Sequence, residues 1–492
     1  MKANSLKAAA GAALLSLATF SSEVQARQYY VDCHRASAGD GSQDNPWNSV
    51  RQVNRPYFRP GDVIALKAGT TCIGTLSPRG VGTADSVITI TKYTSGNETA
   101  NPIVNGKGAR AAITLTNQDH WRISNLTVTN PARGLAARQG IHVTARDGKT
   151  HTGITIDHNT VHHVAGQTDK YRHADDFVLS CGILVDIDTS RPGSRYDNVL
   201  VSHNEVSDCG GGGIKVRVGA MNNRGHKAHV TQNNIRACGG DGIIVSFSDS
   251  PLIDYNVASD LGTGAYPWTG GNFAGMWVLG DHNPTISHNV VYGNIMSDFD
   301  SQAFDCDWGN SGNCTIEYNY SRDNAGGAFL NCDGCGRSGG ADQIVRYNIF
   351  ENDCRIFSNG DRPTLYFYNN VMYCNRKSFD IKVPPRTHFK NNIFVGNRRS
   401  SLPARSGINW KWNVFDGVRP PTKNGIEADP QFVRPDNGGT DLASASGYKL
   451  KKSSPALYNG EIIRDNGGVD FFGNAVSATK KPHRGAYVGP GL

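Results

Sequence analysis

Residues 367–394 read FYNNVMYCNRKSFDIKVPPRTHFKNNIF, and the pattern apolar-x-x-Asn-x-apolar occurs in them twice. The pattern recurs along the chain, for example as IDHNTV, VSHNEV, IDYNVA and ISHNVV. The last three intervals between its asparagines are 21, 22 and 22 residues. A repeat this short, with strands and no helices between them, predicts one coil of a parallel β-solenoid per repeat. We expect these asparagines to stack at one corner: Asn125, Asn159, Asn204, Asn233, Asn256, Asn289, Asn319, Asn348, Asn369, Asn391 and Asn413.

A second predicted strand follows each asparagine, for example GIKVRV and GIIVSF. Because side chains alternate along a strand, aligning these segments predicts one inward column: Ile141, Ile183, Ile214, Ile243, Met276, Phe304, Phe329, Ile356 and Ile381. The alternate side chains should then face outward and form a continuous strip, since neighbouring coils lie about 4.8 Å apart. That strip contains His142, Thr144, Leu184, Asp186, Asp188, Lys215, Arg217, Ile244, Ser246, Ser248, Trp277, Leu279, Asp305 and Asp307.

The chain has 492 residues, 57 of them glycine, and a net charge of +7, a composition that favours short strands and tight turns over helices. Lys2 and Lys7, followed by the apolar run 8–20, predict a signal peptide over residues 1–26 and a secreted or periplasmic product. No later apolar run reaches the roughly 18 residues that a membrane span needs. We expect residues 27–419 to form the solenoid with its N-terminal cap, and residues 420–492 to pack along it as a cover.

Eleven cysteines in an exported chain predict disulfides and at least one remaining thiol. Sequence does not fix the connectivity. The pairs we consider are Cys33 with Cys72, Cys306 with Cys314, Cys332 with Cys335, and Cys354 with Cys374.

Two terminal segments carry a resemblance to a known family. The opening YYVDCHRASAGDGSQDNPWNSV, followed by RPGDVIALKAGT, looks like the N-terminal cap of right-handed parallel β-helix enzymes that degrade polysaccharides. GVDFFGN and GAYV resemble their C-terminal closing segment. The resemblance covers nearly the whole mature chain and implies an all-β, right-handed parallel β-helix. It does not fix the activity, because this architecture hosts lyases, hydrolases, epimerases and adhesins.

Loop lengths predict where a binding groove lies. The connections 159–183, 256–276 and 289–304 are much longer than the others and leave the solenoid at the same corner. They bracket two plain coils, which carry Lys215 and Arg217, and Ser246 and Ser248. We therefore expect a groove with a flat floor and raised walls.

The walls carry residues suited to sugars. Flat rings beside charged groups predict a track for an oligosaccharide, because apolar sugar faces stack on such rings. The candidate substrate-binding residues are Tyr171, Arg172, His173, Tyr266, Trp268 and Trp277. The alternative for Tyr266 and Trp268 is that they pack their own loop.

Aspartates gather at the end of the third long connection. Asp305 and Asp307 alternate on one strand, and Asp298 and Asp300 come from the preceding turn. Carboxylates that converge repel one another unless a cation or a shared proton compensates them. We take Asp305 and Asp307 as catalytic candidates.

The favoured reaction is β-elimination on an acidic, uronic-acid-containing polysaccharide or oligosaccharide. The resemblance to β-helix lyases implies an arginine or lysine base, so Lys215 and Arg217 are the other catalytic candidates. It also implies calcium held by aspartates, for which the candidate ligands are Asp175, Asp176, Asp186 and Asp188. We expect a monomer that binds neither nucleic acid nor membrane.

Three alternatives remain open. A glycoside hydrolase would use paired carboxyls from Asp305, Asp307 and Asp300, with Lys215 and Arg217 binding acid groups of the substrate. A C5-epimerase would need a second acid or base, such as His173 or Tyr171. A non-catalytic adhesin would need only the aromatic track.

Overall fold

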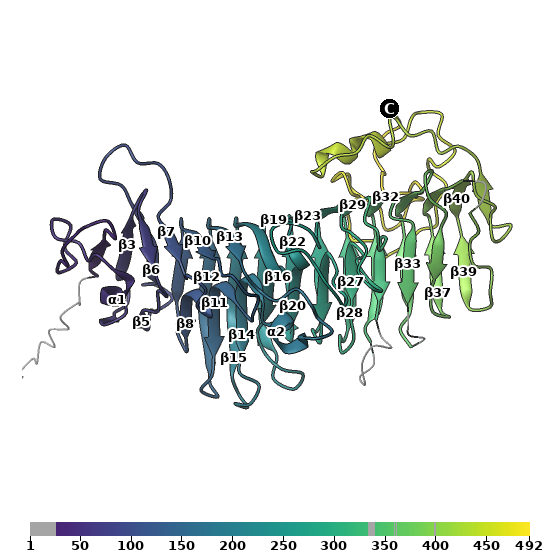
Figure 1. The fold of residues 1–492 in the computed structure, drawn as a ribbon. Coiled ribbons are helices and arrows are strands. Elements are labelled where there is room, and N and C mark those ends of the chain that lie inside the picture. The colour runs from purple at the N-terminus through teal and green to yellow at the C-terminus, as the bar shows by residue number, and fades with distance from the viewer. Residues whose placement is uncertain (1–25, 333–339, 359, 361, 398–399) are drawn as a thin grey trace, which may run out of the picture.

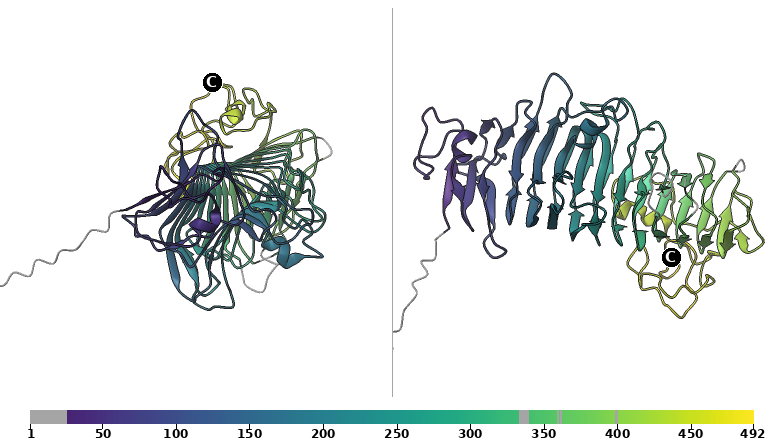
Figure 2. Two further views of the ribbon diagram at one scale, coloured as in Figure 1. Left: turned by 60° about the vertical axis from the view of Figure 1, so that its left-hand side comes forward. Right: turned by 90° about the horizontal axis from the view of Figure 1, so that it is seen from below.

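The computed structural model describes residues 26–332, 340–358, 360, 362–397 and 400–492, and its chain winds into a right-handed parallel β-helix. Each strand pairs in parallel with the strand one coil away. Figure 1 shows the coils stacked into an elongated body, and the end-on view in Figure 2 shows them superposed along one axis. The predicted all-β class and parallel β-helix are confirmed.

Two extended sheets form the faces of the helix. The first has 14 strands: β1 Gln28–Val31, β3 Val63–Lys67, β6 Ile88–Tyr93, β9 Trp121–Ser124, β12 Thr150–Asp157, β15 Arg195–Ser202, β18 Ala228–Thr231, β22 Leu252–Asp254, β25 Thr285–Ser287, β28 Asn313–Glu317, β31 Asp342–Arg346, β34 Leu365–Tyr368, β37 Thr387–Lys390 and β39 Ile408–Lys411.

The second sheet has 23 strands and covers two faces, which are joined because the long strand β16 Glu205–Arg217 runs through both. The face that follows the asparagines contains β4 Thr71–Ile73, β7 Ile103–Asn105, β10 Thr127–Asn130, β13 Thr160–Val164, β19 Asn234–Arg236, β23 Val257–Ser259, β26 Val290–Tyr292, β29 Tyr320–Arg322, β32 Ile349–Glu351, β35 Val371–Tyr373, β38 Ile393–Val395, β40 Asn413–Asp416 and β41 Gly425–Glu427. The other face, called here the groove face, contains β8 Ala111–Thr116, β11 Gln139–Ala145, β14 Cys181–Ile187, β20 Gly239–Ser246, β24 Met276–Leu279, β27 Phe304–Cys306, β30 Phe329–Asn331, β33 Arg355–Ser358 and β36 Asp380–Lys382.

The remaining elements are short. They are β2 Tyr57–Phe58, β5 Arg79–Gly80, β17 Gly225–His226, β21 Ser248–Asp249, the helices α1 Val50–Val53 and α2 Ala174–Val178, and the 3-10 helix η2 Ala443–Tyr448.

The predicted inward column is confirmed on the groove face. Its nine residues pair coil to coil in the predicted register, from Ile141 through Ile214 and Phe304 to Ile381. All but the half-buried Ile381 are fully buried. The column therefore fixes which side chains face out, because a one-residue slip would turn every apolar side chain to solvent.

The asparagine ladder is real, but three of its predicted members are wrong. From Asn159 to Asn348 the side chains bond as predicted, each backbone N–H donating to the next amide oxygen at 2.8–3.1 Å. The ladder then continues through Asn370 and Asn392 to Asn413, not through Asn369 and Asn391. At its start Leu126, not Asn125, occupies the ladder position.

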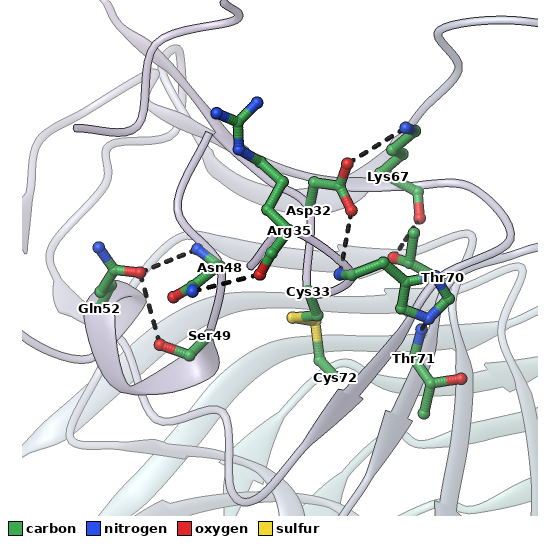
Figure 3. Close-up of a disulfide and its surroundings, with 11 residues drawn as sticks. Asp32, Cys33, Arg35, Asn48, Ser49, Gln52, Lys67, Thr70, Thr71 and Cys72 are labelled. Atoms are coloured by element: carbon green, nitrogen blue, oxygen red, sulfur yellow. Dashed lines mark hydrogen bonds and ion pairs between the residues drawn. A yellow bond between two sulfur atoms is a disulfide. The ribbon is translucent and has the colours of Figure 1, made fainter. Parts of the chain in front are cut away.

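The N-terminal cap closes one end of the core. Trp47, Val50 and Val53 are buried there, and the disulfide Cys33–Cys72 ties the chain after β1 to β4. Figure 3 shows this link together with the ion pair between Lys67 Nζ and Asp32 at 3.1 Å.

The C-terminal segment lies along the flank of the later coils, as Figure 1 shows. Its Phe432, Tyr448 and Leu450 join a buried cluster with Tyr320 and Val371 of the coils. Strand β41 pairs with β40, so the sheet extends beyond residue 419, where we placed the end of the β-helix.

The described disulfides match the predictions. Cys306–Cys314 and Cys354–Cys374 are formed, in addition to the one in the cap. Cys335 of the fourth predicted pair lies outside the described residues. Three buried cysteines are free thiols: Cys181, Cys209 and Cys238.

Residues 1–25 of the predicted signal peptide lie outside the described residues. Within the part that is described, no helix combines the length and apolar character that a membrane span requires.

Candidate active site

The three long connections reach one another. The first contains α2, and the backbone N–H of Lys170 donates to the carbonyl of Gly270 in the second at 2.9 Å. Gly271 of the second connection donates to the carboxylate of Asp298 in the third at 2.8 Å. The raised walls that we expected are therefore joined to one another, because the first connection reaches over the plain coils as an arch to meet the second.

The arch buries Lys215, which is only 5 % exposed. Its Nζ donates to the carbonyl oxygen of Phe177 in α2 at 2.9 Å and lies 4.6 Å from the centroid of that ring. Burial lowers the pKa of Lys215, and the nearby carboxylate of Asp241, 3.5 Å from Nζ, opposes this. The outward direction of Lys215 is confirmed, but the prediction that it is an exposed cation is wrong.

Asp241 links the floor to the second connection. Its Oδ1 accepts from Trp277 Nε1 at 2.9 Å and from the backbone N–H of Ala274 at 3.3 Å. Asp241 was not among the predicted site residues. In the segment DGII it lies two residues before the inward Ile243, so the alternation of the strand would have indicated a polar residue at a buried position.

A groove of about 720 Å³ remains open beside the arch. Polar and charged side chains around it alternate with aromatic ones. The residues lining it are Arg110, Thr144, Arg146, Lys170, Asp175, Phe177, Val178, Leu179, Leu184, Asp186, Ile187, Asp188, Thr189, Lys215, Val216, Arg217, Asp241, Ile244, Ser246, Phe247, Trp277, Leu279, Asp307 and Trp308.

Asp300, Asp305 and Asp307 form a cluster, called here the carboxylate centre, because the charges of Asp300 and Asp307 act on Asp305 and that of Asp300 acts on Asp307. Asp305 is 4 % exposed, and its Oδ1 has no hydrogen-bond partner in the described structure. Burial first, and then the charges of Asp307 and Asp300, raise the pKa of Asp305 well above its ordinary value. The neutral form of Asp305 is therefore favoured relative to an ordinary aspartate.

Asp307 is the member of the centre that lines the groove. Its Oδ1 accepts from the backbone N–H of Trp308 at 2.7 Å. Burial, together with the charges of Asp300 and Asp241, raises the pKa of Asp307 to about 7. The pKa of the half-buried Asp300 is also raised, again mainly by burial.

Lys170 is the cation that acts on all three members of this centre, and Arg355 also acts on Asp300. The positive charge of Lys170 opposes the rise in pKa of Asp300, Asp305 and Asp307. Lys170 Nζ donates to the carbonyl of Asn272 at 3.2 Å, and the side chain of Asn272 bonds Asp300. Because Lys170 lies in a long connection far from Asp307 in sequence, its role was not visible in the sequence.

Several predicted substrate-binding residues do not line the groove. Arg172 pairs with Asp169 at 2.7 Å, and His173 is exposed next to α2. Tyr171 is exposed, and partial burial of its hydroxyl and the charges of Asp298 and Asp300 raise its pKa.

The two aromatic residues of the second connection also lie elsewhere. Trp268 packs edge-on against Phe273 and donates to the carbonyl of Gly271 at 3.1 Å, so it packs its own loop, the alternative we considered, and it lies outside the groove lining. Tyr266 is half-buried near Asp208, outside the groove lining. Trp277 lines the groove as predicted.

The predicted calcium ligands do not converge. Asp186 bonds His142 Nε2 at 2.9 Å, and Asp188 accepts from the backbone and hydroxyl of Ser190 at 2.9 and 2.6 Å. Asp175 and Asp176 lie in the first turn of α2. Across the described ranges, no three or more His, Cys, Asp or Glu side chains gather to hold a metal ion, so these residues do not fit a calcium site.

No protein-family model and no curated protein matches the sequence. Solved structures do match. The GH136 lacto-N-biosidase from Eubacterium ramulus superposes with a TM-score of 0.61, covering 78 % of this chain and 68 % of that chain at 20 % identity. The native form of that protein superposes with a TM-score of 0.55, covering 82 % of this chain and 67 % of that chain at 19 % identity.

A mutant of the PL6 family alginate lyase AlyGC also superposes, with a TM-score of 0.50 over 94 % of this chain and 59 % of that chain at 14 % identity. At these identities the likeness concerns the fold. This chain thus resembles β-helix enzymes that act on glycans, as its terminal segments indicated.

Proposed function

We propose that this chain degrades a polysaccharide by hydrolysing glycosidic bonds, with Asp307 as the general acid and Asp300 as the second carboxylate. The observation that carries the proposal is the carboxylate centre at the groove, where burial and neighbouring charges raise the pKa of Asp307 to about 7. Pairs of carboxyls with raised and separated pKa values are how glycosidases keep one acid protonated while the other is ionised.

The reaction assigns one task to each group. Asp307 donates its proton to the glycosidic oxygen as the bond from that oxygen to the anomeric carbon breaks. The charge of Lys170 favours the carboxylate form of Asp300. As a base, Asp300 takes a proton from the water that attacks the anomeric carbon. As a nucleophile, it attacks that carbon itself and forms a glycosyl ester, which water deprotonated by Asp307 then hydrolyses to free Asp300 again. The raised pKa of Asp305 favours its neutral form, which limits the negative charge of the centre. The anomer released distinguishes the two modes of attack.

β-Elimination is the second candidate, and the lowered pKa of Lys215 favours it, because a neutral amine is a base. The contacts of Lys215 oppose it: Nζ is held by the carbonyl of Phe177 beneath α2. Neither scheme as proposed assigns a step to calcium, because the predicted ligands do not fit a site.

The fold supports a glycan substrate, because it is shared with a lacto-N-biosidase and an alginate lyase. The described disulfides support export, to the periplasm or out of the cell, since disulfides persist in oxidising compartments.

The test is incubation with a panel of neutral and uronic-acid polysaccharides, with reducing ends and ultraviolet absorbance read together, with and without a chelator. Hydrolysis predicts new reducing ends, no unsaturated sugar absorbance and no effect of the chelator. Absorbance that rises in step with the reducing ends would replace hydrolysis by elimination.

Replacing Lys170 with methionine should move the pH profile of kcat/KM upward by about one unit. In the wild type, activity should fall above pH about 7 as Asp307 loses its proton, and at acidic pH as Asp300 gains one. Loss of the Lys170 charge raises the pKa values of Asp307 and Asp300, so the acidic and the alkaline limbs of the profile both move to higher pH. Lys423→Met, at an exposed site, is the control, and an unchanged profile in Lys170→Met would contradict this role.

A further inference from the structure

We propose that the groove recognises the carboxylate of a uronic acid unit through Arg217 and Arg146, at a distance from the scissile bond. This inference rests on the proposed function and adds its substrate class, an acidic glycan. It concerns the part of the groove at the carboxyl ends of β11 and β16.

Arg217 lines the groove without a carboxylate partner of its own in the described chain. Many other arginines pair with carboxylates, for example Arg122 with Asp157 and Arg346 with Glu317. In the described chain no carboxylate oxygen lies within 4.0 Å of the Arg217 guanidinium, and its buried Nε has no hydrogen-bond partner. Its flat group lies over the ring of Phe247 at 5.0 Å, which holds it in place at the groove.

Burial lowers the pKa of Arg217, and the charge of Asp186 opposes this. A guanidinium that is partly desolvated and lacks an acid partner gains most from an arriving anion, because a buried unpaired donor costs free energy.

Arg146 extends the same site. It is exposed and lines the groove. Its guanidinium makes one long contact in the described chain, from Nε to Thr144 Oγ1 at 3.4 Å, while its backbone N–H donates to Asn117. Thr144 pairs with Asp186 in the next coil. The charge of Arg146 contributes to lowering the pKa of the Asp188 carboxyl, so the two groups lie near each other.

The two acids on this side are already engaged. Asp186 bonds His142, and Asp188 caps Ser190. Their charges act on Arg217 and Arg146, but neither acid forms an ion pair with these two side chains in the described chain.

The site lies away from the chemistry. The strands run in the order β16, β20, β24 and β27, so three strand spacings, about 14 Å, separate the coil of Arg217 from that of Asp305. Arg217 and Arg146 should thus bind a sugar unit that is not being cleaved, and their loss should raise KM while kcat changes little. A planar carboxylate fits a guanidinium with two parallel hydrogen bonds.

The experiment measures binding in the Asp307→Asn background, so that cleavage does not interfere, with the fluorescence of Trp277 and Trp308 as the readout. The probes are oligomers of galacturonate, mannuronate and glucuronate, their carboxyl-reduced counterparts, and a sulfated neutral oligomer. At least one uronate should bind about ten- to a hundredfold more tightly than its reduced form, and Arg217→Met should remove this preference.

Two further variants keep the test decisive. Arg146→Met changes an exposed side chain and should reduce the same preference even if Arg217→Met folds poorly. Arg236→Met, an exposed arginine outside the groove lining, should keep it. Three outcomes would overturn the proposal. They are equal binding of every uronate and its reduced form, tighter binding of the sulfated oligomer than of the uronates, and a uronate preference that survives in both arginine variants. Uronate preference without any hydrolysis would instead overturn the proposed reaction and leave this site standing.

Discussion

Asp307→Asn should lower kcat by about 10²- to 10⁴-fold, the usual contribution of a general acid, while substrate binding changes little. Asparagine keeps the size of the side chain and can still accept the hydrogen bond from Trp308, but it has no proton to give to the glycosidic oxygen. The residual rate should also lose its decline above pH about 7, because the group that titrates there is gone. Initial rates of reducing-end release across pH measure both effects.

The same substitution should stabilise the protein. The folded-state pKa of Asp307 lies above that of an unfolded aspartate, so its contribution to stability is largest at low pH and falls as pH rises between those two values. At neutral pH the buried carboxylate of Asp307 lowers the stability of the folded state, and the neutral amide of asparagine does not. The midpoint of thermal unfolding should therefore rise by a few degrees in Asp307→Asn. Asp323→Asn, a carboxyl outside the groove lining, is the control for both rate and stability. An Asp307→Asn enzyme with wild-type kcat would show that the proton comes from elsewhere.

Asn289→Ala should lower the free energy of unfolding by about 3 kcal/mol or more. The Asn289 amide donates to the carbonyls of Ile253 and Ser287 at 2.9 and 3.0 Å, and its oxygen accepts from the backbone of Asn256 at 2.9 Å. All these groups are in the interior, so alanine leaves them without partners where water cannot replace the amide. Urea unfolding followed by circular dichroism measures the loss.

Asn125→Gly is the matched control. Asn125 was expected in the ladder, but its amide contacts only the hydroxyls of Thr91 and Ser124 among the described residues, at 3.2 and 3.3 Å. Glycine tolerates its φ of +58°, so the change should cost well under half of the Asn289→Ala effect. Equal losses at the two sites would mean that the ladder does not hold the coils together.

The displaced ladder assignments have a physical cause. The residue just before each ladder position adopts a left-handed conformation, with φ of 55° at His158 and 53° at Asn369. Asparagine is one of the few residues that tolerate this conformation, so asparagine is favoured at both places. In the pairs Asn369–Asn370 and Asn391–Asn392 the predicted assignment fell on the first asparagine. The spacing of the repeat, with apolar residues three before and two after the ladder asparagine, fits the second one. The inward column had no such ambiguity, because a strand has only two faces.

The site was less predictable than the fold. Alternation along GIKVRV gave the outward direction of Lys215, but it could not reveal that Phe177, from a different connection, covers that side chain. Asp305 and Asp307 were found because they alternate on one strand. Lys170, whose charge acts on them, lies more than a hundred residues earlier and is positioned by a bond between two loops, for which sequence patterns carry no signal.

The central claim, hydrolysis at the carboxylate centre, is tested most directly by cleaving the polysaccharide in water enriched in ¹⁸O and weighing the products by mass spectrometry. Our account predicts one solvent oxygen atom in each new reducing end, and its disappearance with Asp307→Asn. Products that carry no solvent oxygen and contain an unsaturated terminal sugar would contradict it.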